Sequence, residues 1–405
     1  MRTTLKLLRE PPTRLFFFAH ALSSLGSGAG YAGLLLVAYD RHHGPWGITL
    51  VLLADFLPAT VLGPIFGAAA DRWSRRACAV AADVARAGAF VAIAFVHSIE
   101  ATVALALLGG VGAGLFQPAI LAGLPSLVAP NRVPAVMSVY GSVREVGTTV
   151  GPALAALALL LIDPDTLVLC DGLTFAMSAI ALSGLPFGGR PEQAAGDRPS
   201  LMADVREGLR ATRRLPGVGT LIGASAAALL FAGMLNVAEL LFARDELNVG
   251  DSGFSILVAL GGAGIVAGST LGARAAPLDS QRRRYLGGGL LIGASMIGLS
   301  AAPDFPIACA MVVLIGTGNG LVLIYGRVLV QRIVPDALLG RVFGINDGLT
   351  AGAFGIAFVS AGALVSLIGT RALLAVAGAG ALLVWLAASF LLRRAWPSEA
   401  APLTR

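Results

Sequence analysis

The sequence predicts an all-α membrane protein with twelve transmembrane helices arranged in two pseudo-symmetric bundles of six. Three observations predict this fold class: an apolar composition, the regular recurrence of long apolar runs, and an internal repeat. Hydrophobic residues make up 56% of the 405 residues and charged residues only 13%, whereas about a quarter of the residues of a soluble domain are charged. The chain therefore belongs to the polytopic membrane class.

An apolar helix needs about 20 residues to cross a bilayer, and runs of that length recur along the chain with short breaks. The first run is too long for the core of a cleaved signal peptide, so we take it as a retained span. We expect spans near residues 15–39, 46–70, 77–97, 101–125, 135–161, 166–186, 217–243, 252–273, 285–302, 306–330, 341–367 and 371–392.

The charges of the breaks predict the topology. Basic breaks at 71–76, 274–284 and 332–341 are expected in the cytoplasm, and the acidic turns at 163–165 and 304 outside. With this assignment 23 lysines and arginines are cytoplasmic, three are external and three lie within spans, out of 29. The positive-inside rule then places both termini in the cytoplasm of a multi-pass protein of the cell (inner) membrane.

One long polar segment divides the spans six and six. We expect an N-terminal bundle at 1–186, a cytoplasmic linker at 187–216 and a C-terminal bundle at 217–405. Within the linker, Leu201, Val205, Leu209 and Thr212 form one helical stripe among arginines, which predicts an amphipathic helix on the inner leaflet. A plain solvated helix is the alternative.

The two halves repeat with an offset of 205 residues, as expected for parallel six-span repeats. At this offset four glycine or proline positions match: Gly63 with Gly268, Gly67 with Gly272, Pro130 with Pro335, and Gly147 with Gly352.

A charged segment closes the second span. Gly63 and Gly67, four residues apart, share one helix face and should let a neighbouring helix come close. The order of residues resembles the loop between spans 2 and 3 of the major facilitator superfamily, G-x-x-x-G-x-x-x-D-R-x-x-R-R. The matching positions are Gly63, Gly67, Asp71, Arg72, Arg75 and Arg76.

This resemblance implies a cytoplasmic gate in which the acid and the arginines fasten one half of a transporter to the other. Asp83 and Arg86, three residues apart in span 3, can pair on one helix face and are expected to support this gate. The alternative is a generic tight loop.

A second resemblance lies in span 5. Gly147, Gly151 and Pro152 match the export-associated signature G-x-x-x-G-P-x-x-G-G of the superfamily, with Ala155 and Ala156 in place of its last two glycines. The resemblance implies export by antiport. The residues by themselves predict a tight helix contact and a bend, which says nothing about direction.

Charges inside spans are expensive and therefore functional candidates. Asp55 lies some nine residues into span 2, and Arg144 and Glu145 lie about ten residues into span 5; we expect them to handle protons or substrate. A fixed ion pair is the alternative for Arg144 and Glu145. Polar residues that could line a cavity, or simply bond helices together, are Gln117, Asn236, Asn319, Tyr325, Arg327 and Asn346.

No catalytic or metal site is expected. The three cysteines have no metal-ligand spacing, and no phosphate-cradling loop G-x-x-x-x-G-K-[ST] occurs, which excludes direct ATP coupling and predicts no cofactor. Span 4, at 105–124, also lacks the arginine found there in many drug/proton antiporters of the superfamily.

The leading hypothesis is a secondary exporter of amphipathic small molecules, driven by proton antiport and resembling macrolide-efflux and siderophore-export proteins. Its partners are the substrate, protons and the bilayer; no nucleic acid is expected, and the protein is expected to act as a monomer. An uptake symporter or facilitator on the same fold is the runner-up. A membrane-embedded transferase is disfavoured because every expected external loop is short, so no enzyme activity is expected.

Overall fold

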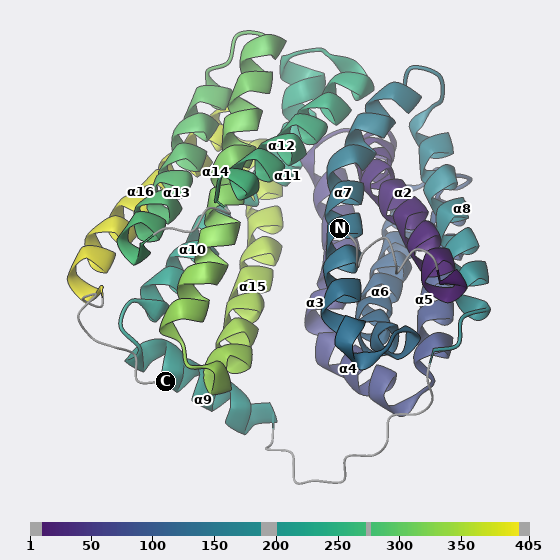
Figure 1. Cartoon of the computed structure of the whole chain (residues 1–405). Helices are drawn as coiled ribbons and strands as arrows, with labels where there is room; N and C mark the ends of the chain where they lie inside the picture. The colour runs from purple at the N-terminus through teal and green to yellow at the C-terminus, as the bar shows by residue number, and fades with distance from the viewer. Residues whose placement is uncertain (1–9, 188–200, 273–276, 397–405) are drawn as a thin grey trace. The chain divides into compact units, whose positions relative to one another are not determined.

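The computed structural model describes residues 10–187, 201–272 and 277–396, which are helical with no strand in these ranges. The helices fall into two compact units (Figure 1). The first unit holds α2 (Pro11–Arg41), α3 (Pro45–Val61), α4 (Gly63–Arg72), α5 (Arg75–Ile93), α6 (Ile99–Gly123), α7 (Val133–Ala158) and α8 (Pro164–Ser183), with 3-10 turns at Leu124–Leu127 and Pro130–Arg132. The second holds α9 (Leu201–Arg214), α10 (Val218–Ala232), α11 (Leu235–Leu241), the π-helical η3 (Phe242–Glu246), α12 (Gly250–Gly272), α13 (Leu278–Ser300), α14 (Phe305–Ile333), α15 (Asp336–Ile368) and α16 (Thr370–Ala395).

The division differs from the expected one in a single helix. Residues 250–259, the first part of α12, group with the first unit, while the sequence places all of 217–405 in the C-terminal bundle. The boundary near residue 195 falls inside the expected linker. Residues 188–200, the first half of that linker, lie outside the described part of the chain.

The helical fold class is confirmed, and eight helical segments of the described chain are long and apolar enough to cross a membrane. The other four expected spans also coincide with helices, but these are interrupted or charged. The span expected at 46–70 is split into α3 and α4, because Pro64 lacks the N–H that a continuous helix would donate to the carbonyl of Thr60. Helices α5, α7 and α13 carry charged residues along their length.

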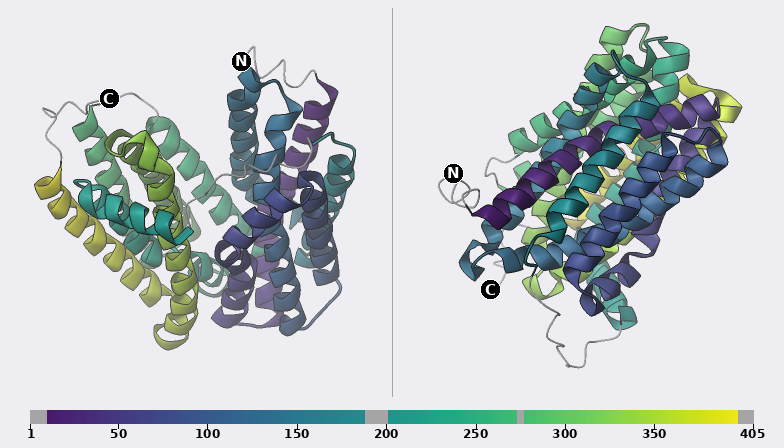
Figure 2. Two further views of the ribbon diagram at one scale, coloured as in Figure 1. Left: turned by 90° about the horizontal axis from the view of Figure 1, so that it is seen from below. Right: turned by 90° about the vertical axis from the view of Figure 1, so that its right-hand side faces the viewer.

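Helix α9 packs on its own unit through small residues. Figures 1 and 2 show it lying across the ends of α10 and α15. Gly208, Ala211 and Thr212 are buried, and a Cβ at Gly208 would lie 2.8 Å from the backbone oxygen of Arg341. Leu209, which the sequence places on the apolar stripe, is 38% exposed. The contact face therefore keeps Thr212 of the expected stripe but has Gly208 and Ala211 in place of Leu209, because α15 comes too close for a large side chain.

Three alternating glycines let α6 hold two neighbours at once. A Cβ at Gly110 would lie 2.3 Å from the backbone oxygen of Asp55 on α3, and one at Gly112 would lie 2.8 Å from that of Ala82 on α5. Gly114, four residues after Gly110, again faces α3. Since residues i and i+4 share a face and i+2 lies opposite, the spacing predicts contacts on two sides. These close approaches exclude any larger residue.

Helix α14 repeats this arrangement in the second unit. Gly316, Gly318 and Gly320 each follow one of the α6 glycines by 206 positions. Cβ atoms at these glycines would lie 2.1 Å from the Gly261 oxygen on α12, 2.5 Å from the Gly288 oxygen on α13 and 2.2 Å from an oxygen on α12, respectively. The repeat in sequence therefore extends to the packing inside each unit, with an offset one residue longer than expected.

The side chain of one arginine joins the ends of four helices in the first unit. The Arg41 side chain, at the end of α2, is only 6% exposed and contacts Asp165 Oδ1 at 2.5 Å. It also donates to Thr102 Oγ1 and to the backbone oxygen of Ile93, each at 2.6 Å. The ends of α2, α5, α6 and α8 are thereby joined. The nearby Asp163 caps α8 by accepting a hydrogen bond from the Thr166 N–H, which lowers the pKa of the Asp163 carboxyl.

The second unit has the same tie with the charges exchanged. Arg371, at the start of α16, contacts Glu246 Oε2 at 2.8 Å and donates to the backbone oxygens of Ser300 and Ala302 at 3.0 and 2.8 Å. Glu246 follows Arg41 by 205 positions, and Arg371 follows Asp165 by 206. Equivalent helix ends are thus joined by an ion pair of opposite polarity in the two units.

Because both polarities occur in the repeat, we expect an exchange of the first ion pair to be tolerated. Asp165→Ala should destabilise the folded protein by about 1–3 kcal/mol, since it leaves a charged donor unpaired, and lower the midpoint of thermal unfolding in detergent. The double variant Arg41→Asp with Asp165→Arg should recover at least half of the loss seen in Arg41→Asp. A double variant no more stable than the worse single variant contradicts the equivalence of the two ties.

Candidate functional site

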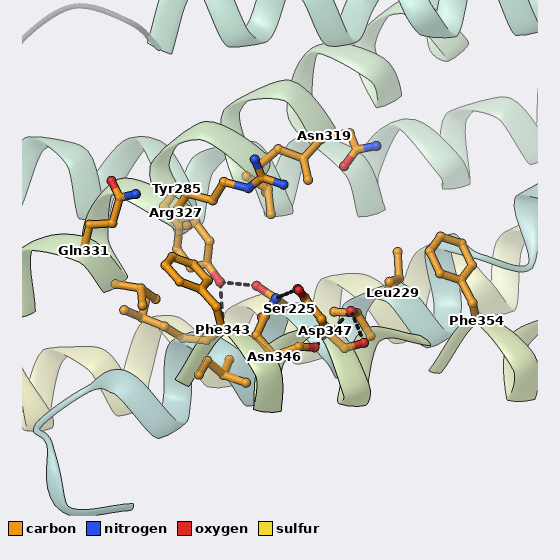
Figure 3. A pocket seen from close by; sticks show the side chains of 17 residues that line it. Ser225, Leu229, Tyr285, Asn319, Arg327, Gln331, Phe343, Asn346, Asp347 and Phe354 are labelled. Atoms are coloured by element: carbon orange, nitrogen blue, oxygen red, sulfur yellow. Dashed lines mark hydrogen bonds between the residues drawn. The ribbon is translucent and has the colours of Figure 1, made fainter. Parts of the chain in front are cut away.

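The second unit contains a cavity of about 630 Å³ (Figure 3). It is bounded by α10, α13, α14 and α15. The residues that line it are Leu221, Ile222, Ser225, Leu229, Tyr285, Asn319, Val322, Leu323, Gly326, Arg327, Val330, Gln331, Phe343, Asn346, Asp347, Thr350 and Phe354.

Helical periodicity places these residues. On α14 they recur at intervals of three and four from Asn319 to Gln331, and on α15 from Phe343 to Phe354. Each series occupies one face of its helix. Figure 3 shows Asn319 and Arg327 on one side of the cavity and Asp347 on the other.

A buried hydrogen-bonded pair closes one wall. Tyr285 is fully buried and its hydroxyl donates to the backbone oxygen of Leu221 at 2.9 Å. The Ser225 hydroxyl lies 2.7 Å from the same Tyr285 oxygen. Since a phenol has one proton, Ser225 is the donor of this second bond. Both hydroxyls are therefore engaged within the wall.

Two charged groups remain available to a ligand. Arg327 and Asp347 are both exposed to the cavity. Among the described residues, no hydrogen bond or ion pair holds the Arg327 guanidinium, and Asp347 Oδ1 accepts one bond from Asn346 Nδ2 at 3.2 Å. The remaining wall is mostly aliphatic and aromatic. The cavity thus offers a cation and an anion on an apolar background.

Three of the six polar residues proposed from the sequence line this cavity: Asn319, Arg327 and Asn346. The other three do not. Tyr325 is buried and accepts a hydrogen bond from Arg284 at 2.7 Å, Asn236 donates to the backbone oxygen of Gly233 at 3.0 Å, and Gln117 is exposed in the first unit. Sequence analysis did not propose five further polar lining residues: Ser225, Tyr285, Gln331, Asp347 and Thr350. Of these, Gln331, Asp347 and Thr350 share a helix face with proposed residues.

The first unit encloses a charged cluster around Arg86. The Arg86 guanidinium lies 3.5 Å from Asp83 Oδ1 and donates to Ser27 Oγ at 3.4 Å. It stacks 3.6 Å above the Phe175 ring and lies 5.8 Å from that of Phe116. The pairing of Asp83 with Arg86 agrees with their spacing. Their surroundings differ from the expected gate, because α2, α6 and α8 enclose them inside the unit.

Two further carboxyls belong to this cluster. Asp171 is only 2% exposed, although it lies within two turns of the start of α8. Glycines of α2 make room for it, since a Cβ at Gly30 would meet its carboxyl. Asp55 is half-buried on α3, and both acids interact electrostatically with Arg86. Sequence analysis proposed Asp55 but not Asp171, because span position alone does not reveal which neighbours face a residue.

The environment expected for Arg144 and Glu145 is not found. Both lie in the middle of α7, but their side chains are 47% and 65% exposed, with nitrogen and oxygen 3.9 Å apart. The Glu145 carboxyl is therefore not enclosed by protein. The opposite face of α7 is the packed one.

That packed face contains the export-associated residues. A Cβ at Gly147 would lie 2.4 Å from Ser24 Cβ, and one at Gly151 would lie 2.5 Å from Gly28 Cα. Pro152 is buried inside the helix. These glycines are where α7 meets the backbone of α2.

The expected gate segment forms α4 and the start of α5. Within the described part of the chain, no atom lies within 4 Å of a Cβ placed at Gly63 or Gly67. The close helix contact expected there is thus not made within the first unit, where α4 is a short helix separate from α3. Arg72 and Arg76 are exposed and Arg75 is half-buried; the Asp71 side chain lies outside the described part.

The repeat partner of Gly63 does make a close contact. A Cβ at Gly268 would lie 2.1 Å from the backbone oxygen of Thr317 on α14. Here α12 continues unbroken to Gly272, so its last turns remain against α14. The difference between the copies follows from the interruption of the first copy at Leu62.

Comparisons with known proteins agree over nearly the whole length. The sequence model of a family described as transmembrane secretion effector, of the MFS type, matches residues 2–404. The multidrug efflux pump Tap of Mycolicibacterium fortuitum is 27% identical over 406 residues, covering 95% of this chain and 97% of that protein. The MFS-type transporter YfiS of Bacillus subtilis is 25% identical over 383 residues, covering 89% and 88%.

Solved structures show the same fold. The nucleoside transporter NupG superposes with a TM-score of 0.75 at 13% identity, covering 95% of this chain and 100% of that one. A bacterial homologue of the human lysosomal transporter Spinster gives 0.70 at 14% identity, covering 96% and 100%. At these identities the likeness concerns the fold alone. Together with the family match, it identifies the chain as a membrane transporter of the transmembrane secretion effector family, within the major facilitator superfamily.

Proposed function

We propose that the protein exports amphipathic small molecules of the drug, antibiotic or siderophore type from the cell by alternating access, in exchange for protons. The observation that carries the substrate class is the cavity of the second unit. Its volume of about 630 Å³ suits a drug-sized ligand, and its apolar wall with a few polar anchors is typical of small-molecule sites. Tap, a relative over 95% of this chain, is named a multidrug efflux pump, which supports the direction.

The cavity favours a ligand with both apolar and charged parts. Arg327 and Asp347 lie on different helices and each has room for a ligand group. Both side chains are exposed to the cavity, so a substrate that pairs with one of them gains an electrostatic contact beyond the apolar burial. The aliphatic and aromatic part of the wall, which includes Leu229, Phe343 and Phe354, suits the apolar part of an amphipathic compound better than a polyhydroxylated one. That difference favours export of amphipathic compounds over uptake of sugars or similar nutrients.

We further propose twelve spans in two six-helix bundles, joined by the linker at 187–216, with both termini in the cytoplasm and the monomer as the working unit. Each of the twelve expected ranges coincides with a helix or a helix pair. Asp83 and Arg86 of α5 point into their own unit, which explains why this helix is less apolar than a lipid-facing span. The segment from Gly63 to Arg76 is proposed to serve as the cytoplasmic gate.

Filling the cavity should block transport of large substrates. Leu323 lines the cavity and is 48% exposed, so Leu323→Trp adds a ring where the ligand would lie. We expect efflux of an amphipathic dye such as ethidium from cells expressing the variant to fall at least about tenfold. Leu314→Trp is the matched control: it is on the same helix, 37% exposed, and absent from the lining. Equal efflux by the two variants would show that the substrate does not use this cavity.

The coupling ion is tested in vesicles with the unaltered protein. A membrane potential of 100 mV contributes about 2.3 kcal/mol per net charge moved, so exchange for one proton can concentrate a neutral substrate by tens of fold. Exchange of one proton for the ethidium cation moves no net charge and is driven by the pH difference alone. Purified protein in inside-out-oriented proteoliposomes should accumulate ethidium when the lumen is acidified, and a protonophore should abolish this accumulation. Accumulation that ignores the pH gradient but follows an imposed sodium gradient would reject proton antiport.

A further inference from the structure

The buried charges of the first unit do not balance. We call Asp55, Asp83, Arg86 and Asp171 the Arg86 cluster. The cluster has one cation and three carboxyls, contributed by α3, α5 and α8. Asp83 is fully buried, Asp171 is 2% exposed and the Arg86 side chain is 15% exposed. A single guanidinium cannot neutralise three carboxylates.

The ion pair between Asp83 and Arg86 is weak and involves only one carboxylate oxygen of Asp83. One of its oxygens, Oδ1, lies 3.5 Å from the guanidinium, a long distance for a charge-assisted bond. The other, Oδ2, is buried and has no hydrogen-bond partner among the described residues, although Ser178 of α8 also faces the carboxyl. A buried carboxylate oxygen without a donor is unfavourable, whereas a protonated carboxyl has only one such oxygen to satisfy.

The Asp171 carboxyl also has no strong hydrogen-bond donor among the described residues. The Thr174 hydroxyl lies 3.3 Å from Asp171 Oδ1 and 2.8 Å from the backbone oxygen of Asp171. Because this hydroxyl has one proton, the shorter contact takes it. The carboxyl is held in a space left by Gly26 and Gly30, where a Cβ would lie 2.8 and 2.2 Å from its oxygens. Its position is therefore shaped by the fold, while its charge is not compensated locally.

The surrounding helices add few charges. His20 of α2 stacks on Tyr140 of α7 with ring centroids 4.5 Å apart, and Arg144 of α7 interacts with both. Helix α6 contributes the Phe116 ring and the Gly112 backbone. Besides the cluster's own acids, the ionisable groups that face the cluster are thus His20 and Tyr140, both of which interact electrostatically with Arg86, while Arg144 lies on the exposed side of α7. With like charges this close, the carboxyls cannot all be ionised in a buried site.

The repeat shows that the fold does not need these charges. With the 206-residue offset, Arg86 corresponds to Ile292 and Asp83 to Gly289. The correspondence is also structural: Arg86 Cγ lies 2.7 Å from a Cβ placed at Gly112, and Ile292 Cγ1 lies 2.8 Å from one placed at Gly318. The space at Gly289 is filled by Trp385.

Asp171 and Asp55 correspond to Ala377 and Gly261 by the same offset. All four positions of the cluster are therefore uncharged in the second unit. Ionisable residues inside a membrane protein are energetically costly, and the second unit folds without them. Their presence in the first unit therefore indicates a function.

We propose that the Arg86 cluster is the proton-binding site of the transporter. This inference rests on the proposed proton antiport. A proton adds to a carboxylate oxygen of Asp83 or Asp171, forming a neutral carboxyl, and Arg86 then pairs with the carboxylate that remains ionised. The Phe175 ring, 3.6 Å from the guanidinium carbon, holds the cation during the exchange of partners. Asp55, the more exposed acid, passes protons between the cluster and water.

The test compares variants in the proteoliposome assay with ethidium as the probe. Asp83→Asn and Asp171→Asn should lose gradient-driven accumulation, which falls from tens of fold to about onefold, while downhill ethidium exchange persists. Glu100→Gln, an exposed acid in the first turn of α6, is the matched control and should couple like the unaltered protein. Variants that still concentrate ethidium within about twofold of the unaltered protein overturn the assignment.

A double variant separates coupling from folding. Arg86→Ile with Asp83→Ala removes both charges of the buried pair, as the uncharged Ile292 and Gly289 do at the corresponding positions of the second unit. Because no partner is left as an unpaired buried charge, the thermal stability should equal or exceed that of the unaltered protein. Coupling should nevertheless be lost. Retained coupling in this stable variant contradicts the proposal, and so does a loss of stability together with coupling, which indicates a structural pair.

Infrared spectroscopy gives a readout that does not depend on transport. The purified protein should show a protonated-carboxyl band that disappears at high pH, and Asp83→Asn with Asp171→Asn should remove most of it. If the unaltered protein ignores the pH gradient, proton antiport fails, and this band alone decides whether the cluster binds protons. If the unaltered protein is proton-driven and the band is unchanged in the variants, the cluster is the wrong site.

Discussion

Close backbone contact at glycine is the constraint on which both units depend. In a bilayer, apolar helices gain little from burying apolar surface against one another, so helix association depends on van der Waals contact and on how closely backbones approach. Helices α6 and α14 meet this requirement with glycines that alternate between two faces. At Gly110, Gly112, Gly316 and Gly318 a single methyl group would overlap a neighbouring backbone. The central helix of each unit can hold two partners only because these positions have no side chain.

The same framework surrounds two different interiors. Where the first unit places Arg86 against Gly112, the second places Ile292 against Gly318. Charge is thereby concentrated in the first copy, and the described cavity with Arg327 and Asp347 in the second. A repeat that keeps its packing residues while its polar residues diverge can assign ion binding and substrate binding to different copies. The ion pairs Arg41–Asp165 and Glu246–Arg371 also keep the packing while the residues diverge. Each pair joins equivalent helix ends, but the positions of the acid and the arginine are exchanged.

Much of the fold followed from local patterns. The apolar runs predicted where helices lie, and the spacing of Asp83 and Arg86 predicted their pairing. Predictions about environment were less successful. Glu145 and Asp171 are both acids within apolar runs, yet Glu145 is 65% exposed and Asp171 is 2% exposed. Which face of a helix is covered depends on partners that are distant in sequence, here α2 against α7 and α8.

The sequence by itself determined the helical class, the membrane setting, the repeat and the superfamily, because these depend on composition and on periodicities carried by each segment alone. Tertiary structure decided which polar residues meet. Asn319, Arg327 and Asn346 share a cavity while Tyr325 does not, and Arg86 is surrounded by acids from three helices. The physical reason is that a side chain's electrostatic surroundings are set by the rotation and contact of whole helices, and residue spacing within one helix carries no information about its neighbours.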